Sequence, residues 1–142
     1  IDWLLAGYNV TLRDRAIAIV GRGRLVGAPL AKLWLGGDLK VTTYDESTID
    51  LRSELRAADV IVTATGVPGL VTSDMISPGK VIVDAGTASE GAEIVGDVAA
   101  DVRERQDITI TPERGGVGPL TIAALFDSVI AAARKTIDPA LL

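Results

Sequence analysis

The distribution of short apolar runs along the chain limits its possible folds more than any other feature. Residues 16–20 form a continuous apolar run, A-I-A-I-V, which ends at Gly21. Further runs rich in apolar and β-branched residues occupy 40–44, 60–64, 81–84 and 108–110. Runs without polar alternation are typical of strands buried on both faces, as in parallel sheets. The chain is therefore expected to contain a mainly parallel sheet.

Segments with the apolar spacing of helices separate these runs. Helices are predicted at 26–35, 51–58 and 119–135, and residues 1–6 have the pattern of the end of an inter-domain helix that stops at Gly7. A short helical or loop segment is expected at 71–76, and a loop at 86–91. Alternating strands and helices favour a Rossmann-like, doubly wound α/β fold. Without an internal repeat or a linker, residues 1–142 are expected to form a single domain.

The last predicted helix is apolar on nearly every side. Such a helix is expected to be buried on more than one side. Our hypothesis is that an apolar strip left exposed on it causes self-association, so a homodimer is expected.

Composition excludes several classes of function. The chain has no Cys and no His, which excludes disulfides, thiolate nucleophiles, imidazole bases and Cys/His zinc sites, so no metal site is expected. Its 14 Lys and Arg against 19 Asp and Glu give a net charge of −5, which disfavours nucleic acid as a partner. No apolar run approaches the roughly 20 residues that cross a bilayer. We expect a cytoplasmic protein with no membrane partner.

The turn after the first apolar run predicts a dinucleotide site. Residues 21–27, G-R-G-R-L-V-G, lie between a predicted strand and a predicted helix. Gly21 permits a tight turn, Gly23 lets the backbone approach a diphosphate, and the helix N-terminus offers free N–H groups. The spacing is one residue longer than the usual fingerprint, and a structural turn without a ligand is the alternative.

Two acidic residues and one arginine bear on the choice of dinucleotide. Asp45 and Glu46 follow the second predicted strand, where a carboxylate can accept hydrogen bonds from ribose hydroxyls and repel a 2′-phosphate. The alternative is that both are solvated loop charges. Arg22 could clamp a phosphate or pair with Asp45. These residues slightly favour NAD over NADP as the cofactor.

Four stretches of the chain together resemble one enzyme family. They are V-G-R-G-R-L-V-G at 20–27, A-T-G-V-P at 64–68, V-D-A-G at 83–86 with V-G-D-V at 95–98, and T-P-E-R-G-G-V-G-P-L-T at 111–121. In this order they are similar to the C-terminal, NAD(P)-binding half of methylenetetrahydrofolate dehydrogenase/cyclohydrolase. The resemblance covers essentially the entire chain, and its most specific part is the last stretch.

The resemblance implies an oxidoreductase that converts methylenetetrahydrofolate to the methenyl form with NAD(P), usually with cyclohydrolase activity that yields formyltetrahydrofolate. It implies cofactor contacts from Gly21, Arg22, Gly23, Asp45, Glu46, Thr65, Gly66 and Thr87. A loop bordering the tetrahydrofolate derivative would comprise Gly115, Gly116, Val117, Gly118, Pro119 and Thr121.

The chain departs from the family pattern at several of these positions. Gly23 replaces a Ser whose hydroxyl could reach a phosphate, and Asp45-Glu46 stand where many members have His-Ser. Thr87-Ala88 replace Ile-Asn beside the nicotinamide, and Arg114 replaces a Pro. The changes at 45 and 46 favour a cofactor without a 2′-phosphate, and those at 87 and 88 put the nicotinamide contacts in question.

The family's catalytic Tyr-x-x-x-Lys pair belongs to an N-terminal half that is not in this sequence. None of the lysines has a Tyr four residues before it, so no catalytic residue is assigned here, and the chain alone is expected to be inactive. Two alternatives stay open: a Rossmann domain of another dehydrogenase, of shikimate or amino-acid type, and a non-enzymatic nucleotide-binding module. The loop at 115–119 favours the folate enzyme over another dehydrogenase.

Overall fold

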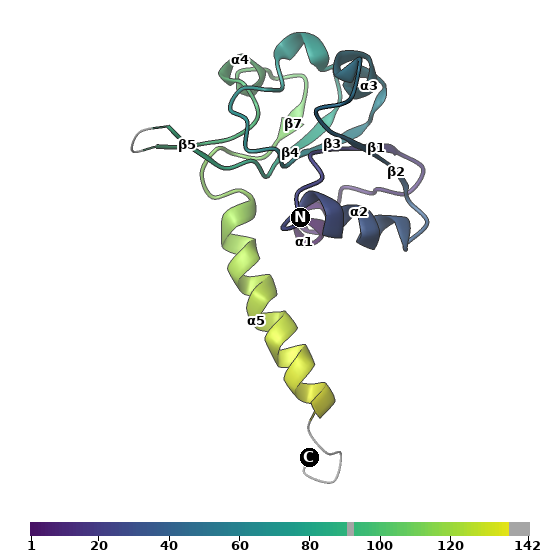
Figure 1. Ribbon diagram of the computed structural model, residues 1–142, viewed down its shortest axis with the longest axis vertical. Helices are drawn as coiled ribbons and strands as arrows, with labels where there is room; N and C mark the ends of the chain where they lie inside the picture. Colours follow the sequence, from purple (N-terminus) through teal and green to yellow (C-terminus); the bar gives the residue numbers. More distant parts are fainter. Residues whose placement is uncertain (91–92, 137–142) are drawn as a thin grey trace.

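The protein is built around a parallel sheet at whose carboxyl edge the predicted site residues lie. The computed structural model describes residues 1–90 and 93–136. Within these residues the main sheet has the strand order β2-β1-β3-β4-β7, and every pairing is parallel (Figure 1). The strands are β1 (Ala16–Val20), β2 (Lys40–Tyr44), β3 (Val60–Thr63), β4 (Val81–Asp84) and β7 (Thr109–Ile110). The predicted Rossmann-like, mainly parallel α/β fold is confirmed.

Helices cover both faces of this sheet (Figure 1). One face carries α1 (Asp2–Gly7) and α2 (Gly27–Leu35), and the other carries α3 (Leu51–Ala57), the 3-10 helix η1 (Ser73–Met75) and α4 (Ala100–Arg103). Side chains alternate between the two cores because successive residues of a strand point to opposite faces. In β1, Ile17 and Ile19 pack with Trp34 of α2, while Ala18 and Val20 pack with Leu55 of α3.

The structure corrects the sequence prediction in three short segments. The expected loop at 86–91 is wrong, because Ala88–Glu90 (β5) pairs with Glu93–Val95 (β6) in an antiparallel hairpin. The four-residue helix α4 was not predicted, since one turn is too short to show helical periodicity. The last helix, α5 (Val117–Thr136), begins two residues before the predicted start at 119.

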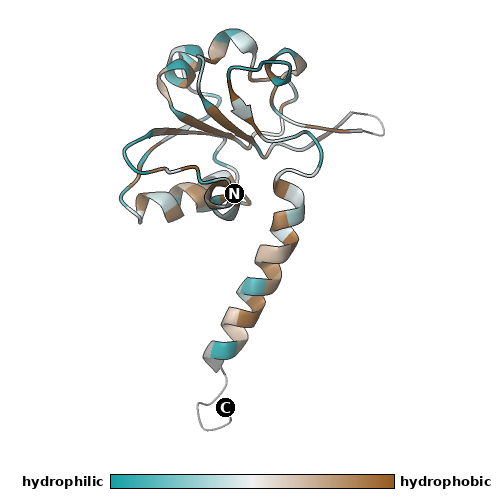
Figure 2. Ribbon diagram, turned by 180° about the vertical axis from the view of Figure 1, so that it is seen from behind, coloured by the Kyte–Doolittle hydropathy of each residue, from teal (hydrophilic) through white to brown (hydrophobic). Residues whose placement is uncertain are grey.

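Helix α5 extends away from the sheet instead of packing along it (Figure 1). The expectation that it is buried on more than one side is therefore wrong. Val117 and Leu120 in its first turns are partly buried. Five large apolar side chains further along are at least half exposed, and the ribbon in Figure 2 is coloured hydrophobic along much of this helix: Ile122, Leu125, Phe126, Val129 and Ile130. By length and composition alone, Val117–Arg134 is apolar enough to cross a membrane, contrary to our reading of the apolar runs. A helix that covers a second protein surface has the same composition.

Candidate functional site

The candidate site lies where the strand order of the sheet reverses. From β1 the chain moves outward to β2, and it then crosses back to β3 on the other side of β1. The carboxyl ends of β1 and β3 are therefore neighbours, and the loops that follow them diverge. Parallel α/β sheets bind ligands in the crevice at such a switch point.

The glycine turn is packed directly against the end of β3. Gly21 has φ +102°, and a Cβ built on it would lie 2.4 Å from the backbone oxygen of Ala64. A Cβ on Gly27, the first residue of α2, would lie 1.9 Å from the backbone oxygen of Gly21. Both positions therefore require glycine. Gly23 differs, because its nearest neighbour in the Cβ direction is 4.0 Å away.

A groove of about 570 Å³ opens beside this turn. It brings together six of the predicted cofactor residues: Gly21, Arg22, Gly23, Asp45, Glu46 and Thr65. The walls come from three loops, which follow β1, β2 and β3. The groove is thus the place where a nucleotide lying across the switch point would fit.

The Asp45 carboxylate is held in a fixed orientation at this groove. Its Oδ1 accepts hydrogen bonds from the Ser47 amide at 3.0 Å and the Ser47 hydroxyl at 2.5 Å. Its Oδ2 lies 3.1 Å from Nη1 of Arg22, so the predicted pairing of these two side chains is observed. The hydrogen bonds from Ser47, with a smaller contribution from Arg22, hold the pKa of Asp45 below its usual value. Arg22 also donates from Nε to the Thr43 hydroxyl at 3.0 Å.

A second pocket, of about 390 Å³, lies at the ends of β4 and β7. It collects Thr87 and the whole predicted folate-side loop: Gly115, Gly116, Val117, Gly118, Pro119 and Thr121. Residues 117–119 form the first turn of α5, so that part of the predicted loop is helical. The remaining predicted cofactor residue, Gly66, lines neither pocket. It has φ +71°, and a Cβ built on it would lie 3.5 Å from the Thr87 backbone oxygen.

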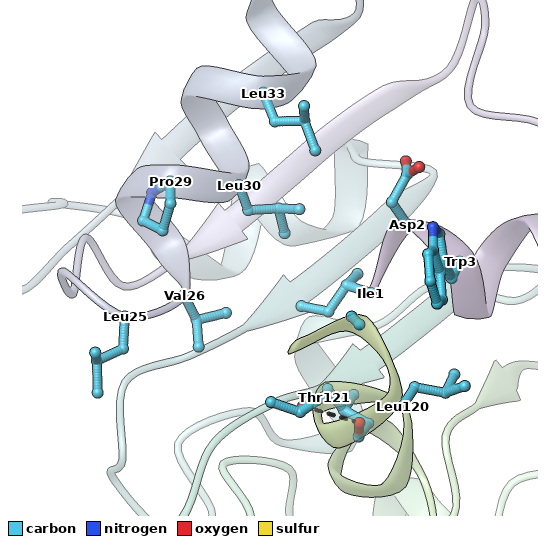
Figure 3. Close-up of a pocket in the computed structure, with 12 residues that line it drawn as sticks. Ile1, Asp2, Trp3, Leu25, Val26, Pro29, Leu30, Leu33, Leu120 and Thr121 are labelled. Atoms are coloured by element: carbon cyan, nitrogen blue, oxygen red, sulfur yellow. Dashed lines mark hydrogen bonds between the residues drawn. The ribbon is translucent and has the colours of Figure 1, made fainter. Parts of the chain in front are cut away.

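An apolar pocket of about 420 Å³ lies between α1, α2 and the start of α5 (Figure 3). Ile1, Leu30 and Leu120 contribute to its lining. Val117 and Thr121 line both this pocket and the second one, so the first turns of α5 separate the two.

Sequence reasoning missed a polar network at the second pocket, whose members Asp84 and Arg103 line it. Asp84 at the end of β4 accepts hydrogen bonds from the Thr63 hydroxyl and from the amides of Gly86, Asp97 and Val98, all at 3.0–3.1 Å. Its other strong partner is the Arg103 guanidinium of α4. Asp97 itself is fully buried. Asp84 and Asp97 stood inside matched motifs, but a carboxylate in a sequence gives no sign that it is buried.

The chemistry of these residues fits a dinucleotide. The turn presents backbone at the N-terminal end of α2, which favours a diphosphate. The Asp45 carboxylate offers an acceptor for hydroxyl groups, and the second pocket has room for a ring. Among the described residues, no group of three or more acidic side chains could hold a metal ion.

Fold and site together define a dinucleotide-binding domain of the Rossmann class. The model of the tetrahydrofolate dehydrogenase/cyclohydrolase NAD(P)-binding domain matches residues 1–137. The chain belongs to this family, so the resemblance seen in the sequence is confirmed, and a domain of an unrelated dehydrogenase is not favoured.

Relatives of known sequence or structure support the same assignment. The bifunctional protein FolD of Bordetella avium is 40% identical over 137 residues, which cover 96% of this chain and 48% of that protein. The cytoplasmic C-1-tetrahydrofolate synthase of Rattus norvegicus is 38% identical over 139 residues, 93% of this chain and 15% of that protein.

Two solved enzymes superimpose closely on the chain. The FolD methylenetetrahydrofolate dehydrogenase/cyclohydrolase of Campylobacter jejuni gives a TM-score of 0.87 at 36% identity, covering 96% of this chain and 49% of its own. The Trypanosoma brucei enzyme, solved with NADP and an inhibitor, gives a TM-score of 0.85 at 32% identity. The match covers 95% of this chain and 48% of that enzyme. The chain thus spans about half the length of these FolD relatives.

Proposed function

We propose that this chain is the cofactor-holding half of a methylenetetrahydrofolate dehydrogenase with cyclohydrolase activity. A bound dinucleotide would place its diphosphate over the turn at 21–27, its adenosine beside Asp45 and its nicotinamide toward Thr87. The observation that carries this proposal is the packing of Gly21 on Ala64 and of Gly27 on Gly21. This packing brings the backbone of the turn and the N-terminus of α2 to the switch point.

The proposed cofactor is NAD in preference to NADP. An aspartate is ionised at neutral pH, and the lowered pKa of Asp45 keeps it so in more acidic solution; a carboxylate beside the ribose repels a 2′-phosphate. Arg22 is already engaged by Asp45 and Thr43, so it would have to leave these partners to bind that phosphate. The NADP in the Trypanosoma brucei structure is a property of that enzyme.

In the full-length enzyme, the second pocket would face the tetrahydrofolate derivative. The nicotinamide supplies the hydride acceptor when the cofactor is bound. This chain's own residues would bind and orient the cofactor, with Gly115–Thr121 closing the side toward the folate. General acid–base groups would come from the other half, so we propose that the chain alone does not turn over substrate.

The exposed apolar side of α5 supports a proposal about assembly. We propose that it packs against the other half in the full-length protein, and that the chain alone self-associates through it as a homodimer. The proposed location is the cytoplasm, which is also the location named for the rat relative.

Titration calorimetry of the chain with NAD and with NADP tests the binding proposal. The expected result is saturable one-site binding with a lower dissociation constant for NAD. An absence of heat with both nucleotides would overturn the proposal. Tighter binding of NADP would overturn only the cofactor preference.

A further inference from the structure

One buried carboxylate connects the two halves of the candidate site. Asp97 follows β6 and is fully buried. Its Oδ2 accepts a hydrogen bond of 2.6 Å from the backbone amide of Thr65, which lines the nucleotide groove. Its Oδ1 packs against Gly86, which lines the second pocket. Asp97 therefore touches the loop after β3 on one side and the loop after β4 on the other.

Gly86 is the residue that makes room for this carboxylate. A Cβ built on Gly86 would lie 2.0 Å from Oδ1 and 2.1 Å from Cγ of Asp97. The carboxylate belongs to a fully buried side chain whose Oδ2 is hydrogen-bonded to the Thr65 amide. Any side chain at position 86 would therefore push Asp97 away from the Thr65 amide.

Hydrogen bonds to Asp84 fix the position of Asp97. Its own amide donates to Oδ1 of Asp84 at 3.1 Å, and the Gly86 amide donates to the same oxygen at 3.0 Å. Asp84 is in turn paired with Arg103. These contacts hold the loop that carries Asp97 and the loop that carries Gly86 at a constant separation.

Stability alone does not account for this arrangement. Oδ1 of Asp97 has no hydrogen-bond partner within the described part of the chain, although it is buried. An incompletely satisfied buried carboxylate costs free energy of folding, and an apolar residue would not carry that cost. Such a cost is typically retained where geometry matters for function.

We propose that Asp97 is a positioning residue for the dinucleotide. It fixes the Thr65–Gly66 loop and the Gly86–Thr87 loop in one arrangement. The nucleotide groove and the second pocket are thereby held at the separation that one dinucleotide spans. This inference rests on the proposed function and deepens it by assigning a role to a residue that does not itself touch the cofactor.

Two variants break the same contact from opposite sides. Asp97→Ala removes the acceptor of the Thr65 amide, and Gly86→Ala displaces it. Both are expected to raise the dissociation constant for NAD by about tenfold, because the Thr65–Gly66 loop is no longer held in place and has to be ordered when the dinucleotide binds. Asp97→Asn keeps an oxygen acceptor and is expected to stay within about threefold of the wild-type value. Gly7→Ala is the matched control, because a Cβ on Gly7 meets nothing within 4 Å.

Affinity is measured by calorimetry at a temperature where each variant keeps the wild-type circular dichroism spectrum. The amide proton shift of Thr65 in ¹H–¹⁵N spectra reports the contact directly. It should move upfield in Asp97→Ala and Gly86→Ala and stay near its original value in Asp97→Asn. If Asp97→Ala does not fold, Gly86→Ala still tests the contact, because it removes no polar group.

The outcomes separate this inference from the proposed function. Loss of affinity together with the Thr65 shift, and recovery of both in Asp97→Asn, supports the positioning role. Wild-type affinity in variants whose Thr65 amide has moved would overturn it. A wild-type chain that binds neither NAD nor NADP would overturn the proposed function, and this inference with it.

Discussion

Replacing Gly23 with Ser is a sharp test of how the glycine turn holds a ligand. Gly21 and Gly27 cannot accept a Cβ, but the nearest atom in the Cβ direction of Gly23 is the Ala64 oxygen at 4.0 Å, and Gly23 is not in the left-handed region. Folding therefore does not require glycine here. A side chain at this position restricts the unfolded chain, so Gly23→Ser should raise the free energy of unfolding by about 0.5 kcal/mol and the Tm by about 2 °C.

The same substitution should tighten dinucleotide binding. A hydroxyl at Gly23 would stand beside the diphosphate, and one hydrogen bond to a charged oxygen contributes about 1.5 kcal/mol, or roughly tenfold in the dissociation constant. Gly23→Ala is the matched control, because it adds the Cβ without the hydroxyl and should leave affinity near the wild-type value. Thermal melts and calorimetry measure the two effects. A lower Tm, or weaker binding in Gly23→Ser than in Gly23→Ala, would refute the reasoning.

Three further predictions concern the charges of the groove, the partly buried phenol of Tyr44 and the last helix. Asp45→Ser should shift the ratio of NADP affinity to NAD affinity about tenfold toward NADP, and Arg22→Ala should shift it toward NAD. Each variant removes one unit charge a few ångströms from the ribose. If calorimetry gives the wild-type ratio for both variants, this prediction is contradicted. Burial, with a hydrogen-bonded carboxylate neighbour, raises the pKa of Tyr44 to about 12. The protonated phenol therefore contributes fully to the free energy of unfolding below pH 10, and this contribution is lost as the pH rises toward 12. The difference in tyrosinate absorbance between the wild type and Tyr44→Phe should show this titration. Replacing Leu125 and Phe126 with Glu should reduce self-association in sedimentation experiments, and a wild-type chain that stays monomeric at high concentration would argue against the role of α5.

The sheet could be predicted from the sequence because its central strands are apolar runs and its edge strand β2 is rich in β-branched residues. Residues 17–20 and 60–63 are buried on both faces, so they carry no competing pattern. The hairpin of β5 and β6 and the helix α4 were missed because these short elements mix charged and apolar residues and so lack the apolar run that marks β3 and β4. A short element without such a run is set by its tertiary neighbours instead of by a local pattern.

The candidate site was partly predictable for a related reason. The residues of the glycine turn and of the loop at 115–121 are recognisable in order along the chain, and the structure brings them to neighbouring pockets. The network beneath them was not predictable, since the packing of Gly86 on Asp97 joins two segments through space. The apolar composition of α5 likewise indicates that the helix needs a partner surface without indicating where that surface is.

A crystal structure of this chain soaked with NAD tests the central claim most directly. The account predicts density for the diphosphate against the backbone amides of residues 21–27, with the adenosine ribose within hydrogen-bond distance of Asp45. A turn filled by its own side chains, with the nucleotide absent or bound elsewhere, would contradict the account.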